Sequence, residues 1–120
     1  MAYTDNFFML KSGPSSGRKW VFLHGLMGYA SNWRKIISLL PPDECVLAFD
    51  QRGHGRSFHP TSGYAPEDYA DDLFFILQEL EWQKVNLVGH SMGGRNAMNF
   101  AWRFPEKVNR LVIEDIAPSM

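Results

Sequence analysis

Cysteine is almost absent from this sequence, because Cys45 is the only one among 120 residues. A single thiol cannot form an internal disulfide, which fits a reducing compartment, and its apolar surroundings predict a small core residue. Neither sign of charge is in excess, since 12 basic and 13 acidic residues leave a net charge of -1. This balance gives no electrostatic case for binding nucleic acid or a membrane surface.

Long apolar runs are also lacking. No stretch approaches the length that spans a bilayer, and residues 1–10 have no basic region, so we expect neither a membrane helix nor a signal peptide. Repeats and linkers are absent too, which favours one domain. We expect a cytoplasmic protein, or one of the mitochondrial matrix if the source is eukaryotic. The composition is globular, with 45% hydrophobic and 21% charged residues.

The most informative stretch covers residues 85–94, where a short apolar run leads into a Gly-x-Ser-x-Gly turn. This pattern is typical of a strand that turns sharply into a helix. Such a turn strains its central residue, Ser91, and needs small neighbours two positions away, here Gly89 and Gly93. It would expose the hydroxyl of Ser91, with the N–H of Met92 nearby for a developing oxyanion. The alternative is a glycine-rich turn with an incidental serine.

Apolar runs alternate with helical patterns along the chain. Strands are predicted at 7–10, 20–23, 45–49, just before Ser91, and at 108–113, and helices are predicted to begin near Ser31, Pro66 and Ser91. This alternation predicts an α/β fold with a mostly parallel sheet and helices on both faces. The loops that follow parallel strands meet at one edge of the sheet, where ligands bind. Four such loops carry polar residues, namely His24, Asp50, Ser91 and Asp115.

Three motifs together resemble the α/β-hydrolase superfamily. They are HGLMG at 24–28, DQRGHGRS at 50–57 and GHSMGG at 89–94, and they occur in the family's order on the expected elements. The resemblance covers the whole chain but only about the first half of the family's domain. Residues 1–120 are therefore expected to be a partial domain that ends where the family inserts its cap. Within the family, the turn at Ser91 combined with the sequence DIAP at 115–118 resembles the small bacterial and mitochondrial acyl-ester and acyl-thioester hydrolases.

The resemblance implies a role for each matching residue. Ser91 would be the nucleophile, and the backbone N–H groups of Leu26 and Met92 would form the oxyanion hole. The loop at 50–57 is expected to be structural, with Asp50 and Arg52 as a candidate pair. No cofactor and no metal is implied. The remaining motif residues would shape the substrate pocket, and they are His24, Gly25, Met27 and His90.

The base that would activate Ser91 is missing from the sequence. The family's chain order is serine, acid, histidine, whereas all four histidines precede Ser91. We expect the histidine, the later strands and the cap to belong to a complementary C-terminal fragment. The triad acid is either Asp115 or an aspartate beyond residue 120. Without the fragment, the strand at 108–113 would be a bare apolar edge prone to self-association.

These observations predict a serine hydrolase that cleaves a small carboxylic ester or thioester through an acyl-enzyme, and whose isolated chain is inactive. Two alternatives remain. One is a lyase of the menaquinone-pathway type from the same superfamily, in which Arg95 would bind a carboxylate. The other is a catalytically inert fragment that only associates or binds a ligand. The sequence leaves the natural substrate and the acyl length open.

Overall fold

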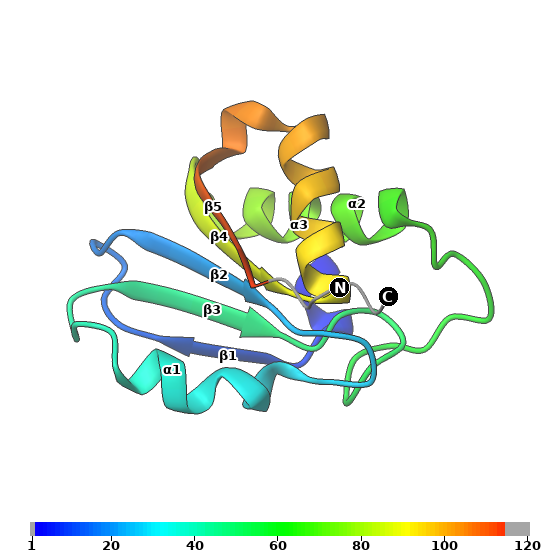
Figure 1. Ribbon diagram of the computed structural model, residues 1–120, viewed down its shortest axis with the longest axis horizontal. Coiled ribbons are helices and arrows are strands. Elements are labelled where there is room, and N and C mark those ends of the chain that lie inside the picture. The colour runs from blue at the N-terminus through cyan, green and yellow to red at the C-terminus, as the bar shows by residue number, and fades with distance from the viewer. Residues whose placement is uncertain (1, 115–120) are drawn as a thin grey trace.

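A five-stranded sheet forms the centre of the computed structural model, which describes residues 2–114 (Figure 1). The spatial order of the strands is β1-β3-β2-β4-β5. Every neighbouring pair is parallel except β1 and β3. The mostly parallel sheet predicted from the sequence is therefore confirmed. The strands are β1 (Met9–Ser12), β2 (Lys19–Leu23), β3 (Cys45–Phe49), β4 (Val85–His90) and β5 (Val108–Glu114).

Three α-helices and three 3₁₀ turns complete the described chain. The helices are α1 (Arg34–Ser38), α2 (Pro66–Leu80) and α3 (Met92–Arg103), and the turns are η1 (Tyr3–Asn6), η2 (Ala30–Trp33) and η3 (Pro105–Lys107). The helix expected from Ser31 onward is split into η2 and the short α1. The carboxylate of Asp50 fixes the start of η2 by accepting a hydrogen bond from the N–H of Ala30 at 2.6 Å.

The first strand begins two residues later than the sequence predicted. Phe7 is buried, and its ring packs edge-on against Phe49 and Phe58 at centroid distances of 5.5 and 5.2 Å. Phe7 therefore fills the space between β3 and the loop that follows it. Pairing with β3 therefore starts only at Met9, opposite Phe49.

Helices cover both faces of the sheet, which explains the unbroken apolar runs in its central strands. Successive side chains of β3 point to opposite faces. Leu47 and Phe49 join a core with α2 and α3, whereas Val46 and Ala48 join a smaller core with η2 and α1. Cys45 is buried in the larger core, as predicted.

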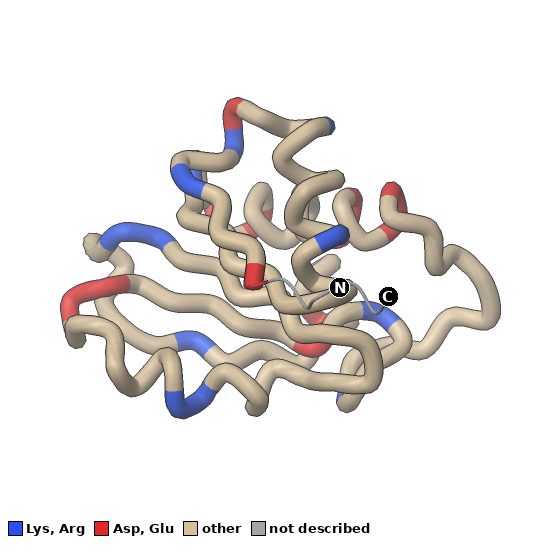
Figure 2. The backbone as a smooth tube through the Cα atoms, in the orientation of Figure 1, with Lys and Arg blue, Asp and Glu red and all other residues tan. Residues whose placement is uncertain are grey.

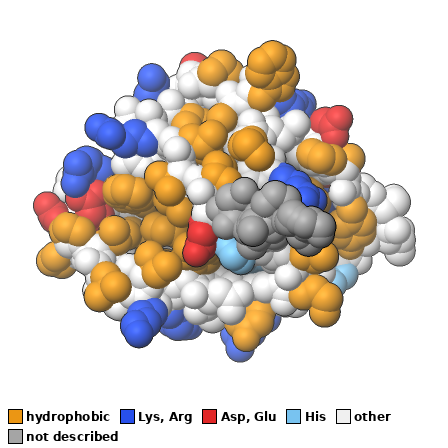
Figure 3. Space-filling model, in the orientation of Figure 1, with side chains coloured by type: hydrophobic (Ala, Val, Ile, Leu, Met, Phe, Trp, Pro, Cys, Tyr) orange, Lys and Arg blue, Asp and Glu red, His pale blue; other side chains and the backbone are white. Residues whose placement is uncertain are grey.

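β5 lies at the edge of the sheet and pairs with β4 alone among the described strands. Leu111 and Val112 on this strand are 39% and 49% exposed, and on the neighbouring α3 Met98 and Trp102 are exposed as well. Figure 3 shows hydrophobic side chains over the strands and near the end of α3.

Lys and Arg are interspersed with Asp and Glu along the chain (Figure 2). None of the helices described in residues 2–114 has the length and hydropathy needed to cross a membrane.

Candidate active site

Ser91 occupies a strained position between β4 and α3. Its backbone angles are φ 56° and ψ -118°, and it is the residue that precedes the first turn of α3. Few non-glycine residues adopt a positive φ, and those that do are held there by their surroundings. The carbonyl oxygen of Ser91 accepts hydrogen bonds from the N–H groups of Gly94 and Arg95 at 2.8 and 3.1 Å. The turn that the Gly-x-Ser-x-Gly pattern predicts is therefore present.

The two glycines that flank Ser91 sit against backbone atoms. A methyl group on Gly89 would lie 2.3 Å from the carbonyl oxygen of Gly93. A methyl group on Gly93 would lie 2.2 Å from the carbonyl oxygen of Leu23 and 2.5 Å from that of His24. Real side chains do not approach other atoms so closely. The tight turn thus depends on the absence of a side chain at both positions.

Leu26 and Met92 border the same cavity, as an oxyanion hole would require. Met92 is the first residue of α3, so its N–H lies outside the helix's own hydrogen bonding. Leu26 lies in a tight turn closed by a hydrogen bond from the N–H of Gly28 to the carbonyl oxygen of Gly25, at 2.9 Å. Met27, in the same turn, has a positive φ of 63°.

The cavity that Leu26 and Met92 border has a volume of about 720 Å³ and is the larger of two cavities near Ser91. It lies between the turn at 25–28, the loop after β3 and the beginnings of α2 and α3. Met27 lines it and is 84% exposed. The other predicted pocket residues lie elsewhere, since His24, Gly25 and His90 line a smaller cavity of about 310 Å³. The larger cavity is walled mainly by apolar and aromatic side chains, which include Leu26, Tyr64, Tyr69 and Met92.

The side chain of His24 is buried, and hydrogen bonds within the protein occupy both of its ring nitrogens. Its Nδ1 donates to the carbonyl oxygen of Gly25 at 2.8 Å, and its Nε2 accepts from the N–H of Gln51 at 2.9 Å. The side chain of Gln51 donates to the carbonyl oxygen of His24 and accepts from the amide of Asn96, both at 2.9 Å. These bonds join the loops that follow β2 and β3 to the second turn of α3, the helix that begins directly after Ser91. The sequence motifs predict no role in such a network for Gln51 or Asn96. For Asn96, the available signal is a polar residue on the buried face of a helix.

Burial lowers the pKa of His24 from 6.5 to about 4, so its ring is neutral at pH 7. The unfolded chain takes up a proton between these two values and the folded chain does not, so stability rises with pH across this interval. We expect His24 to cost roughly 2 kcal/mol of stability when the pH falls from 7 to 5. Urea unfolding at both pH values checks this. Between pH 7 and pH 5, the His24→Asn variant should lose less unfolding free energy than the unaltered protein, whatever its stability at pH 7. An equal loss in both proteins would show that His24 does not cause this pH dependence.

Asp50 and Arg52 do not form the pair that the sequence suggested. The carboxylate of Asp50 accepts from the backbone N–H groups of Ala30 and Arg56 at 2.6 and 2.8 Å. Arg52 instead makes a bidentate ion pair with Asp72 of α2, in which its Nε and Nη2 donate to the two carboxylate oxygens at 2.7 and 2.8 Å. The two side chains diverge because the backbone N–H groups already occupy the carboxylate of Asp50. This ion pair connects the loop at 50–57, which forms one wall of the larger cavity, to α2.

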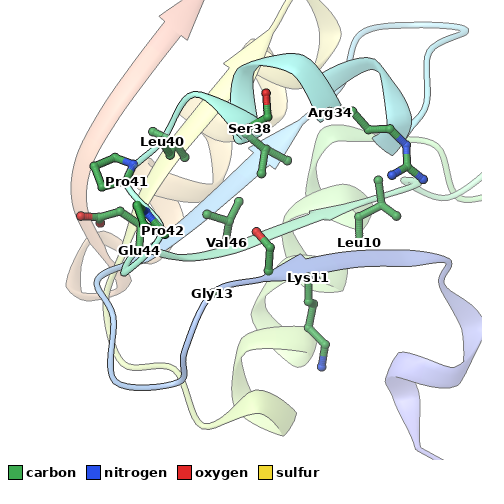
Figure 4. Close-up of a pocket in the computed structure, with 12 residues that line it drawn as sticks. Leu10, Lys11, Gly13, Arg34, Ser38, Leu40, Pro41, Pro42, Glu44 and Val46 are labelled. Atoms are coloured by element: carbon green, nitrogen blue, oxygen red, sulfur yellow. The ribbon is translucent and has the colours of Figure 1, made fainter.

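Asp115, the candidate triad acid, lies outside the described residues. Within residues 2–114, no group of three or more histidine, cysteine, aspartate or glutamate side chains is arranged to hold a metal ion. A third cavity of about 440 Å³ lies between α1, β1 and β3. Figure 4 shows the side chains of Leu10 and Val46 pointing toward α1 there, and that of Lys11 pointing away. None of the three sequence motifs contributes to this cavity, so it is separate from the candidate active site.

The mostly parallel sheet and the strained serine after β4 are the features of an α/β hydrolase, and comparison with known proteins gives the same class. Residues 21–120 match the alpha/beta hydrolase fold family, and the chain belongs to this family. An sn-1-specific diacylglycerol lipase, ABHD11 of Danio rerio, is 41% identical over 90% of the chain. A Bacillus subtilis protein provisionally named 2-succinyl-6-hydroxy-2,4-cyclohexadiene-1-carboxylate synthase is 37% identical over 90% of the chain.

Among solved structures, a marine microorganism esterase superposes with a TM-score of 0.87 and is 41% identical over 94% of the chain. The relatives thus include an esterase and a lipase. The chain covers 42% of the esterase, 34% of the lipase and 40% of the Bacillus protein. It therefore spans well under half the length of these relatives.

Proposed function

We propose that this protein is a serine hydrolase that cleaves carboxylic esters or thioesters, with Ser91 as the nucleophile. The strained backbone of Ser91 carries the proposal, because strain of this kind persists where the surrounding structure enforces it and is concentrated at active sites. The neighbouring residue Met92 lines a cavity of about 720 Å³ that can receive a substrate. The esterase and the lipase among its relatives support an ester as substrate.

In the proposed reaction, the Oγ of Ser91 attacks the carbonyl carbon of the substrate and its proton passes to a base. The N–H groups of Leu26 and Met92 donate to the oxygen that becomes negative. The tetrahedral adduct then collapses, the alcohol or thiol leaves with the proton from the base, and an acyl-enzyme remains. Water attacks the acyl group by the same route and releases the carboxylic acid.

We further propose that the base is a histidine on a segment that packs along β5. All four histidines of the sequence precede Ser91, and both ring nitrogens of His24 are engaged in its structural network. The exposed Leu111 and Val112 offer that segment an apolar surface beside an unpaired strand edge among the described residues. The acid that orients the histidine is Asp115 or an aspartate on the same segment. Without it, the same edge favours self-association.

Fluorophosphonate labelling and a panel of p-nitrophenyl esters test the proposal. With the complementary segment present, we expect labelling of Ser91 and turnover of esters. The 120-residue chain by itself should be nearly inert, because loss of a triad base costs on the order of 10⁶ in turnover. Appreciable turnover by this chain, free of a second polypeptide, would contradict the location of the base. Failure of the complete protein to turn over any ester would contradict the hydrolase.

A second candidate function is the superfamily lyase that acts on a carboxylated ring. Arg95 favours it, because this exposed residue lines the larger cavity and forms no ion pair with another described residue. A free guanidinium suits a carboxylate. The Bacillus relative, named for a synthase of a cyclohexadiene carboxylate, points the same way. The ester panel separates the two functions, since a lyase of this kind leaves simple esters intact.

A further inference from the structure

A fourth cavity, of about 250 Å³, lies at the edge of the sheet where the parallel strands begin. Its walls come from the segment that leads into β2, from the start of β4 with the loop before it, and from the start of β5. The residues are Gly17, Arg18, Lys19, Lys84, Asn86 and Asn109. Ser91 follows the opposite end of β4, roughly 16 Å from Asn86 along an extended strand. The cavity is therefore separate from the candidate active site.

The walls of this cavity carry three cations and no carboxylate. Glu44 compensates only one of these cations, because its two carboxylate oxygens accept from the Nε of Arg18, both at 3.1 Å. Lys19 and Lys84 form no ion pair with any residue in the described range 2–114. Figure 2 shows the basic segment at the beginning of β2. Two positive charges thus remain uncompensated around one small space.

Contacts with the protein already hold the ammonium group of Lys19 in place. Its Nζ donates to the carbonyl oxygens of Ser15 and Gly17, the latter at 2.8 Å, and lies 5.6 Å from the centroid of the Trp82 ring. An ammonium group has three N–H donors, so one remains after these two hydrogen bonds. Because the side chain is ordered beforehand, a ligand that binds to it loses less conformational entropy.

A buried amide adds a neutral donor to the same cavity. Asn86 is only 5% exposed, and its Oδ1 accepts a hydrogen bond from the Nδ2 of Asn109 at 3.0 Å. The Nδ2 of Asn86 has no such partner among the described residues. It is nevertheless not one of the three polar atoms there that are both unpartnered and closed to solvent. The amide N–H groups of Asn86 are therefore accessible from the cavity that this residue lines.

The chemistry of these groups selects an anion with several oxygen acceptors. Ammonium and amide N–H groups can only donate, so a metal cation would be repelled and an apolar ligand would leave them unpaired. A carboxylate would compensate one of the two free charges. A phosphate group carries close to two negative charges and accepts several charge-assisted hydrogen bonds at once. A volume of 250 Å³ equals about eight liquid waters, which is enough for a phosphate group with a small substituent.

We propose that this cavity binds a dianionic phosphate group, either inorganic phosphate or the phosphate of a small monoester. The group accepts from the ammonium groups of Lys19 and Lys84 and from the amide of Asn86. It thereby connects the beginning of β2 to the beginning of β4, and a ligand that binds only the folded chain also stabilises it. The site makes no contact with Ser91, so it stands or falls independently of the proposed hydrolase function.

Calorimetric titration of inorganic phosphate into the protein with its complementary polypeptide tests the site. The titration is made at pH 8, where phosphate is mainly a dianion, with the ionic strength held constant by sodium chloride. We expect saturable binding, and Lys84→Gln should weaken it about tenfold because a charged donor is lost. The control Lys35→Gln removes the same charge from an exposed position of α1 that lines none of the four cavities, and it should stay within twofold.

Asn86→Asp should abolish phosphate binding, because a carboxylate of nearly the same shape replaces the amide donor. Urea unfolding shows whether each variant is folded. Equal weakening by Lys84→Gln and Lys35→Gln would overturn the site, since it would show only a general attraction of anions. Absence of saturable binding would also overturn it, including the case in which a carboxylate of the complementary polypeptide fills the cavity.

Methyl phosphate distinguishes the two sources of the phosphate group. Binding of methyl phosphate at least as tight as that of inorganic phosphate would assign the site to a monoester, because the substituent is then accommodated. Weaker binding of methyl phosphate would assign the site to the free ion. If both probes bind equally well to Asn86→Asp and to the unaltered protein, the buried amide is not part of a site and the proposal is wrong.

Discussion

Ser91→Ala is expected to lower ester turnover by the complete protein on the order of 10⁶-fold, because the substitution removes the atom that attacks the carbonyl. The fold should persist. Ser91 contributes its backbone to the start of α3 through two hydrogen bonds to its carbonyl oxygen, and alanine keeps both. Initial rates with p-nitrophenyl butyrate and labelling by a fluorophosphonate measure the effect.

The matched control is Ser16→Ala, which removes a hydroxyl from an exposed position in the loop before β2. Its rates should equal those of the unaltered protein. Urea unfolding of the Ser91 variant shows whether any loss comes from misfolding. If Ser91→Ala keeps more than a few percent of the activity while it folds normally, the nucleophile lies elsewhere and the strained turn has another purpose.

The sequence could predict the turn at Ser91 because the constraint is local. Few backbone conformations can connect a strand to a helix within so short a stretch. A side chain at Gly89 would clash with the turn itself, and one at Gly93 would clash with the end of the adjacent strand, so both positions need glycine. The parallel sheet was predictable for a related reason. Both faces of β3 and β4 are covered, so their apolar runs show no alternation, and only crossover connections join such strands.

The contacts that support the site could not be predicted from local patterns. Arg52 was expected to pair with Asp50, two positions away, but it meets Asp72 on another element. The bond between Gln51 and Asn96 joins residues 45 positions apart. Nothing in either local sequence selects such partners, because they depend on how β3 and α3 meet in space. The place of Glu114 beside His90 likewise follows from the register of β4 and β5.

The same supporting contacts connect the fold to the proposed chemistry. His24 directly follows β2, binds the loop after β3 through Gln51, and is followed by the turn that carries Leu26. The carbonyl oxygens of Leu23 and His24 also lie against Gly93 in the first turn of α3. The two segments that would supply the oxyanion donors are therefore fixed to each other by backbone contact. Any residue that forces them apart should affect stability and catalysis together.

Gly93→Ala is expected to have the largest effect on stability of any substitution considered. Its methyl group would stand 2.2 Å from the carbonyl oxygen of Leu23 and 2.5 Å from that of His24, and backbone atoms cannot rotate away as a side chain can. The end of β2 must therefore separate from α3. Overpacking of this kind costs about 3 kcal/mol or more, a large part of the stability of a small domain. Urea unfolding at pH 7 measures the loss.

The adjacent Gly94 provides the matched control within the same helix. A methyl group there would lie 3.0 Å from the Cγ2 of Ile113, a side-chain methyl group that has to move by only a few tenths of an ångström. Alanine also favours the helix by about 0.5–1 kcal/mol relative to glycine, so Gly94→Ala should stay within about 1 kcal/mol of the unaltered protein. Because the forced separation moves Leu26 away from Met92, Gly93→Ala should also slow the labelling of Ser91 under conditions where the variant is folded. Equal stability of the two variants would show that β2 and α3 are not in the close contact on which the oxyanion hole depends.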